Sequence, residues 1–148
     1  MAAPSSNPTT PPSVGAPWQA SETYAATEGV LAATLASTVW LPTVWPDDVD
    51  HLELFAITSR RSVGYEARGP VREGLALLVG RVHTNHAPIF DRPMAQLDDM
   101  PWPTWESANG PAYLLTWIED AAVTVHLLGS WTRSEAILSL RSLRPVHP

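Results

Sequence analysis

Cysteine and lysine are both absent from this 148-residue chain. Without cysteine the protein cannot form a disulfide, an iron–sulfur centre or a thiolate zinc site. Without lysine it cannot form a Schiff base with a carbonyl substrate. The Gly-x-Ser-x-Gly nucleophile elbow and the Gly-rich phosphate loop are also missing. A metal-bound water or a carboxylate would have to carry any chemistry, so the sequence favours a non-catalytic protein without a cofactor.

Positive charge is scarce as well. Nine arginines stand against 15 acidic residues, which gives a net charge of −6, and the arginines form no basic run. Because neutralising phosphates requires a basic face, we expect no nucleic-acid partner.

Long apolar runs are absent too. No window approaches the ~20 apolar residues of a membrane span, and the N-terminus has no basic start followed by an apolar segment, as a secretory signal would. The sequence predicts a cytoplasmic protein, or an extracytoplasmic one near a membrane if a signal or anchor segment was removed.

The first 19 residues are rich in Pro, Ser and Thr and show no periodicity. Such a segment buries too little apolar surface to offset its ordering entropy, so we expect a tail or linker over residues 1–19. Residues 20–148, in a chain that is 45% hydrophobic, are enough for one domain with its own core.

The first half of the domain predicts one helix and three strands. Ser21 is a suitable N-cap for a helix that ends near Thr38, and residues 40–50 form a turn-rich connector. Alternating or continuous apolar residues predict strands over the ranges 51–58, 62–67 and 74–82. Arg68-Gly69-Pro70 is expected to break the second strand, and residues 83–103 are irregular, with a short helix over 93–97.

The last third predicts a hairpin followed by a helix. Asn109-Gly110 suits a type I′ turn between a strand that begins at Trp105 and a strand over 112–118. The alternation resumes at Val123. Thr132 and Glu135 then have the spacing of a capping box, and Pro145 is expected to stop the helix. This order predicts an α+β fold, with an antiparallel sheet of about six strands and the N-terminal and C-terminal helices packed on one face.

One group of residues could bind a metal. His83, His86 and Asp91 offer two imidazoles and a carboxylate, which suits zinc or a similar ion. They lie on a loop, however, where nothing fixes the two rings toward one point, and a histidine pair in such a loop is more often an ordinary surface feature.

The seven tryptophans form a second candidate site. Trp117 is expected in the core because it shares a strand face with Tyr113 and Leu115. Trp40 is expected to anchor the first helix and Trp131 to precede the second helix as a hydrophobic staple. Three others could contact a partner, or could cap the core from loops; they are Trp45, Trp102 and Trp105.

Several segments together resemble a family. The connector LPTVWP after a helix, the strands AYLLTW and VTVHLLG, and the closing helix SEAILSLRSL are similar to extracytoplasmic domains of bacterial lipoproteins and of anti-sigma-factor-like sensor proteins. This resemblance implies a curved antiparallel sheet with a packed helix, used for sensing or protein contact outside the cytoplasm.

Three functional hypotheses follow. The leading one is a non-catalytic binding or accessory domain that acts through protein contacts. The second is a small metal-dependent hydrolase built on His83, His86 and Asp91. The third is a structural subunit that its N-terminal tail fixes to a larger assembly.

Overall fold

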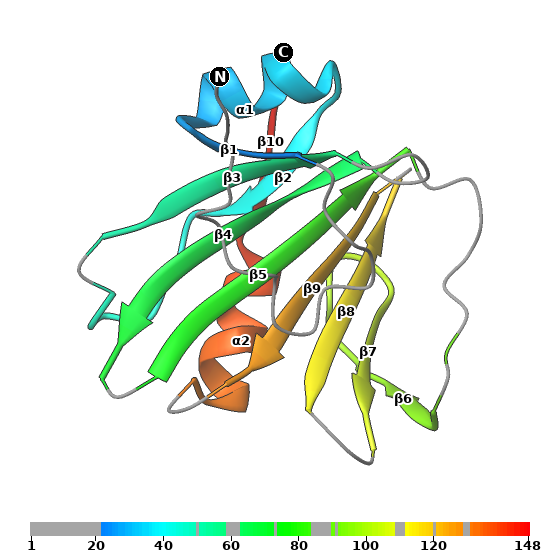
Figure 1. The fold of residues 1–148 in the computed structure, drawn as a ribbon. Helices are drawn as coiled ribbons and strands as arrows, with labels where there is room; N and C mark the ends of the chain where they lie inside the picture. The colour runs from blue at the N-terminus through cyan, green and yellow to red at the C-terminus, as the bar shows by residue number, and fades with distance from the viewer. Residues whose placement is uncertain are drawn as a thin grey trace.

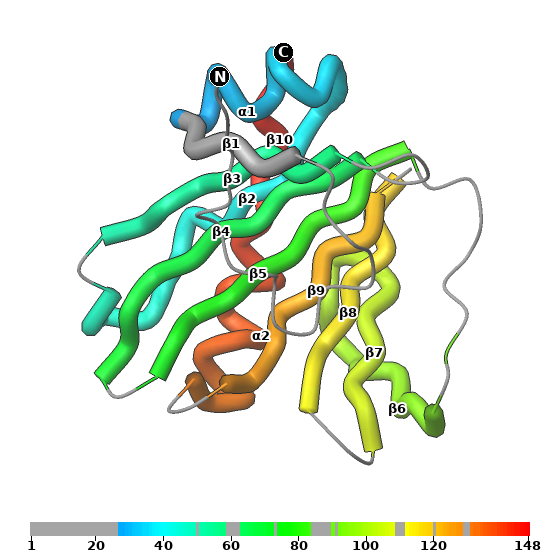
Figure 2. The backbone as a smooth tube through the Cα atoms, in the orientation of Figure 1, coloured from blue at the N-terminus to red at the C-terminus, as the bar shows by residue number. Residues whose placement is uncertain are grey.

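The computed structural model describes residues 22–49, 51–58, 63–72, 74–83, 90, 92–108, 112–119, 121–128 and 131–148, and for residues 22–26 only the backbone. These described residues form an eight-stranded sheet, a two-stranded sheet and two helices (Figures 1 and 2). This is therefore an α+β protein dominated by antiparallel sheet. Neither helix of the described part has the length and apolar run needed to cross a bilayer.

The large sheet has the strand order β1-β3-β4-β5-β9-β8-β7-β6, and every neighbouring pair is antiparallel. Its strands are β1 (Glu22–Ala26), β3 (Glu53–Thr58), β4 (Val63–Val71), β5 (Gly74–Val82), β6 (Met94–Gln96), β7 (Thr104–Ser107), β8 (Tyr113–Ile118) and β9 (Ala121–Leu127). β2 (Val39–Pro42) and β10 (Leu143–Val146) form the small sheet.

Two capped helices complete the fold. α1 (Glu28–Leu35) begins at Thr27, whose side chain accepts the N–H of Val30, and it ends at Ala36 in the left-handed conformation. α2 (Arg133–Arg141) begins with the predicted capping box, because Thr132 and Glu135 each accept the other's backbone N–H. The capping-box prediction is confirmed.

One face of the large sheet carries the hydrophobic core. In β4 the odd-numbered residues face the core, and in β5 the even-numbered residues do. Tyr65 and Leu78 are examples, and both are fully buried. Buried residues of both helices belong to the same core, among them Leu31 of α1 and Leu140 of α2. Figure 1 shows α2 behind the sheet as drawn.

Tyr65 connects the two sheets through this core. Its hydroxyl donates to the backbone oxygen of Trp40 at 2.5 Å and accepts the N–H of the same residue at 3.1 Å. Burial raises the pKa of this phenol, so it stays a donor. The ring lies over Gly80, where a Cβ atom would come within 2.0 Å of it, so glycine is required at that position.

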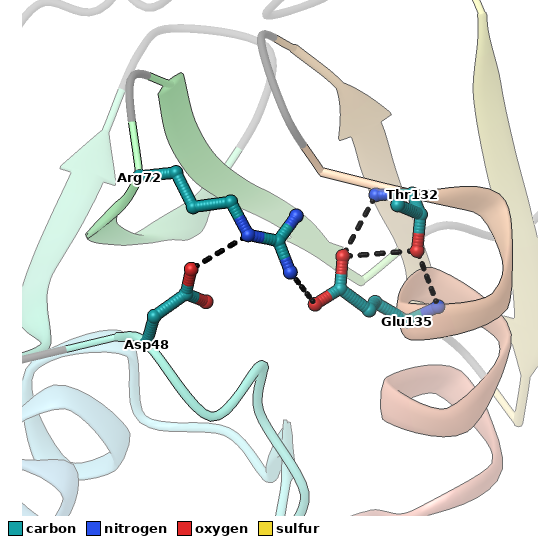
Figure 3. A network of polar contacts seen from close by, with 4 residues as sticks. All are labelled: Asp48, Arg72, Thr132 and Glu135. Atoms are coloured by element: carbon teal, nitrogen blue, oxygen red, sulfur yellow. Dashed lines mark hydrogen bonds and ion pairs between the residues drawn. The ribbon is translucent and has the colours of Figure 1, made fainter.

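A network of polar contacts joins three segments on the core side of the large sheet (Figure 3). Arg72, in the β4–β5 turn, contacts Asp48 at 2.8 Å and Glu135 at 3.2 Å. Glu135 also accepts from the backbone and hydroxyl of Thr132, at 3.0 and 2.9 Å. The network thereby connects the hairpin, the loop after β2 and the start of α2.

The predicted first helix is wrong over its first turns. Residues 22–26 pair with β3 as an edge strand, and α1 occupies only residues 28–35. The register of this pairing aligns residue 22 with Thr58 and residue 26 with Leu54. A long-range backbone pairing of this kind overrides the helix propensity of the alanines, which is a weak local preference.

Three local predictions about proline-containing segments are also wrong. β4 continues through Arg68, Gly69 and Pro70 instead of breaking there. A strand, β6, replaces the predicted helix over 93–97. Pro145 lies inside strand β10, and α2 has already ended at Arg141. The sheet accordingly has eight strands instead of about six, while the predicted strand over 74–82 is confirmed.

Candidate functional site

The face of the large sheet opposite the core carries a grid of polar and aromatic side chains. Strand register places them in three rows that cross the sheet. The first row is Glu53, Arg68, Leu77, His126, Tyr113; the second is Phe55, Glu66, Val79, Thr124, Leu115, Trp105; the third is Ile57, Gly64, Arg81, Ala122, Trp117. We call this set the polar–aromatic face.

The centre of the polar–aromatic face is apolar and buried. Ile57, Leu77 and Val79 are each 1% exposed. In Figure 1 this face is turned toward the viewer, and neither helix of the described part lies across it. The side chains around this floor are half-buried, among them Trp117 and Arg81.

Glu66 is a fully buried carboxylate at the edge of the floor. Its Oε2 accepts from Arg68 Nε at 2.8 Å and Nη2 at 2.5 Å, while its buried Oε1 has no hydrogen-bond partner. Burial raises the pKa of this carboxyl, and the Arg68 guanidinium opposes part of that rise. Arg68 also lies 4.5 Å from the ring centre of Phe55, in a cation–π arrangement.

His126 lies on the far side of the floor. Its Nε2 is buried and has no hydrogen-bond partner. Burial lowers the pKa of this imidazole to about 4, so the ring is neutral at pH 7. Its ring centre lies 5.9 Å from that of Tyr113, which in turn lies 5.5 Å from the guanidinium of Arg92.

Glu66 and His126 are too far apart to exchange a proton with each other directly. The two residues are on strands β4 and β9, which are separated by β5, and they occupy different rows. With strands ~4.8 Å apart and ~3.4 Å between residues, their Cα atoms are roughly 12 Å apart. A pair that is to share a proton must lie within hydrogen-bond reach. The arrangement therefore suits binding by two separate polar anchors on either side of an apolar floor.

The three predicted contact tryptophans do not lie together. Trp105 is on the polar–aromatic face, with its ring centre 5.4 Å from that of Phe90. Trp45 and Trp102 are half-buried and pack against the hydrophobic core. Trp45 meets Trp131 edge-to-face at 6.0 Å, and Trp102 meets Trp40 at 5.6 Å.

Trp117 was predicted to lie in the core, but it lies on the polar–aromatic face. Tyr113, Leu115 and Trp117 do share one strand face, as their alternation predicts. That face is the half-buried polar–aromatic one, and the core side of β8 is formed by Leu114 and Ile118. Alternation alone cannot tell which of two faces will be covered.

The predicted metal group falls largely outside the described residues. His83 is exposed at the end of β5, with φ of 59°. His86 and Asp91 lie outside the described residues. Within the part of the chain that the structure describes, no three His, Asp or Glu side chains are arranged to hold a metal ion.

Glu66, Arg68 and His126 were not predicted as functional residues. The signal that could have found the first two is their i, i+2 spacing beside the apolar Tyr65 and Ala67, which places both charges on the other strand face. The predicted break at Arg68-Gly69-Pro70 left Arg68 outside the strand, whereas β4 includes it. No family model, no curated protein and no solved structure matches this chain.

Proposed function

We propose that this protein is a non-catalytic binding domain that holds a protein partner on its polar–aromatic face. The observation that carries the proposal is the gathering of Phe55, Trp105, Tyr113 and Trp117 with Arg68 on one sheet face. Tryptophan, tyrosine and arginine are the residues that most often dominate the binding energy of protein interfaces.

In this proposal, both helices and the small sheet pack on the core face, which is opposite the polar–aromatic face. In its support, buried residues of α1, α2, β2 and β10 all belong to the core that packs on Tyr65 and Leu78. A domain built in this way leaves the polar–aromatic face as its second large surface.

The chemistry of the face supports contact with a polypeptide. The floor is apolar, the rim is aromatic and cationic, and the polar anchors Glu66 and His126 are too far apart for proton exchange. Buried polar atoms gain hydrogen bonds when a partner supplies donors and acceptors at these two places. The resemblance described above further supports a setting outside the cytoplasm, which fractionation of source cells would test.

Site-specific photo-crosslinking in source cells tests the proposal. p-Benzoylphenylalanine at Trp105 should capture a discrete protein partner, because that position lies on the face. The matched control carries the same group at Leu138, which is 56% exposed on α2. Capture of the same protein from both positions, or from neither, contradicts the proposal.

The captured partner, once purified, allows a quantitative test. Trp117→Ala should weaken its binding at least tenfold, because truncation of a hot-spot aromatic costs ~2 kcal/mol or more. Leu138→Ala should leave the dissociation constant unchanged. Calorimetric titration of both variants measures the difference, and equal effects would show that the contact lies elsewhere.

A further inference from the structure

Charge is distributed unevenly between the polar–aromatic face and the rest of the described chain. The three rows of the face, together with Arg92 over the Tyr113 ring, hold three arginines and two glutamates. Among the other described side chains, carboxylates outnumber arginines, in keeping with the net charge of −6 for the whole protein. The polar–aromatic face is therefore the more positive region of the described part of an acidic protein.

The positive charge gathers on the half of the face that strands β5, β9, β8 and β7 form, which we call the aromatic half. On these four strands the three rows contain no Asp and no Glu, and the aromatic side chains of β7 and β8 lie there. The pKa of His126 is about 4, so this ring is neutral at pH 7. Arg81 and Arg92 therefore give the aromatic half its charge.

Both guanidinium groups suit contact with a carboxylate. Each has five N–H donors in a planar fork, so it can donate to a carboxylate of a partner in addition to its contacts within the chain. Burial lowers the pKa of Arg81, and a carboxylate brought against the guanidinium raises that pKa again. The contact of Arg92 with the Tyr113 ring, at 5.5 Å, places the second cation at the other end of the aromatic half.

We propose that the protein partner binds through an acidic segment, two carboxylates of which contact Arg81 and Arg92. This inference rests on the proposed function and specifies the chemistry of the partner that the face binds. Opposite charges on two surfaces accelerate their association and exclude partners of the wrong sign. A basic segment would meet like charge at both ends of the aromatic half.

Strand register sets the spacing of the two carboxylates. Arg81 is on β5 in the third row, and Tyr113, which carries Arg92, is on β8 in the first row. Two strand spacings of ~4.8 Å and four residues of ~3.4 Å separate these positions, which gives roughly 17 Å. An extended chain covers that distance in about five residues. The line between the two arginines crosses the second row at Thr124, so the residues between the carboxylates meet Thr124 and Leu115.

The captured partner itself provides the first test. Mass spectrometry of the product crosslinked at position 105 identifies the segment that lies on the face. That segment should contain two Asp or Glu residues about five positions apart. A crosslinked segment without acidic residues overturns this inference, while its capture leaves the proposed function standing.

Arginine variants provide the second test. Arg81→Gln and Arg92→Gln should each weaken binding of the captured partner about tenfold, because each removes one charged hydrogen-bonded pair. Arg81→Lys should lose less than Arg81→Gln, since it keeps the charge. The matched control is Arg141→Gln, at an exposed position on α2. Calorimetric titration measures all four, and an equal loss in the control overturns the inference.

Ionic strength provides the third test. Association of the partner with the wild-type protein should slow several-fold between about 50 mM and about 500 mM NaCl, because salt screens attraction between exposed charges. The double variant Arg81→Gln/Arg92→Gln should lose most of this dependence. Stopped-flow mixing measures the rates, and the same salt dependence in both proteins contradicts the inference.

Replacement of the partner's two acidic residues by their amides separates this inference from the proposed function. Each replacement should weaken binding to the wild-type protein and have little further effect on the variant that lacks the matching arginine. Fully additive losses, with Trp117→Ala still weakening binding, contradict the acidic contact alone. Absence of any captured partner contradicts the proposed function, and the inference that rests on it falls too.

Discussion

Strand β5 has buried side chains on both faces, but the residues around them are apolar on one face and partly polar on the other. Leu78 is fully buried in a core that residues from both helices complete. Leu77, its neighbour in sequence, is 1% exposed, yet it shares its row with Arg68 and His126. The comparison teaches that a continuous apolar strand can bury both of its faces in different surroundings, one apolar and the other partly polar.

The largest expected effect is the loss of stability when Leu78 is truncated, compared with the smaller loss for Leu77. Leu78→Ala should lower the free energy of unfolding by about 2–5 kcal/mol, because it leaves a cavity that rigid neighbours cannot close. Leu77→Ala should cost less, near the lower end of that range, because the half-buried side chains of Arg68 and His126 beside it can shift toward the space. Urea denaturation measures both values. A larger loss for Leu77→Ala would show that the polar–aromatic face is the principal core.

The second prediction concerns pH and His126. Its pKa in the folded protein is about 4, against 6.5 for the free side chain. Above pH 6.5 the ring is neutral in both states, and its contribution to stability is complete. As the pH falls toward 4 the unfolded chain binds a proton that the folded chain does not, so the free energy of unfolding decreases.

His126→Gln should therefore remove part of this acid sensitivity. The free energy of unfolding of the variant should fall less between pH 7 and pH 4, by up to about 3 kcal/mol. Urea midpoints at pH 7, 5.5 and 4 measure the difference. Parallel pH profiles for wild type and variant would show that the ring is hydrated in the folded protein.

Glu66 should change the free energy of unfolding with pH in the opposite direction from His126. In the folded protein the pKa of Glu66 is raised above 4.5, its ordinary value. As the pH rises from 4.5 toward the folded pKa, the unfolded chain therefore releases a proton that the folded chain keeps. The free energy of unfolding therefore decreases with rising pH in that window. Glu66→Gln should abolish this decrease while it keeps the shape of the side chain, as urea midpoints between pH 4 and pH 7 would show. An unchanged slope would contradict the assignment.

The smallest expected effect concerns the core side, at the network of Figure 3. Arg72 has φ of 50°, where a Cβ atom costs ~1 kcal/mol and glycine costs nothing. Arg72→Ala should lose about 0.5–1 kcal/mol, since the ion pairs are partly exposed. Arg72→Gly loses the same pairs but relieves the backbone, so its net change should be near zero. Thermal unfolding of both variants tests this order, and a greater loss in the glycine variant would refute it.

Short-range patterns predicted much of the fold. The continuous apolar run of Gly74–Val82 is a central strand, and the spacing of Thr132 and Glu135 is a capping box. Segments with proline or with competing propensities were predicted less well. Pro70 and Pro145 lie within strands, and residues 22–26 form a strand although their alanines favour a helix.

The candidate site was predicted less completely than the fold. The sequence identified Trp105, and it showed that Tyr113, Leu115 and Trp117 share a face. It assigned that face to the core because hydrophobic alternation carries no information on which side the helices will cover. Glu66 and His126 were missed because their role depends on burial.

The sequence by itself determined the alternation within each strand and the start of α2, since these depend on contacts between residues a few positions apart. It also excluded cysteine and lysine chemistry. Only the tertiary structure decided which face became the core and which rows cross the sheet. Those outcomes depend on pairing between β5 and β9, more than 40 residues apart in the chain. Glu66 and the Nε2 atom of His126 are buried in the folded chain, and burial shifts the pKa values of the two side chains in opposite directions because it disfavours the charged form of each.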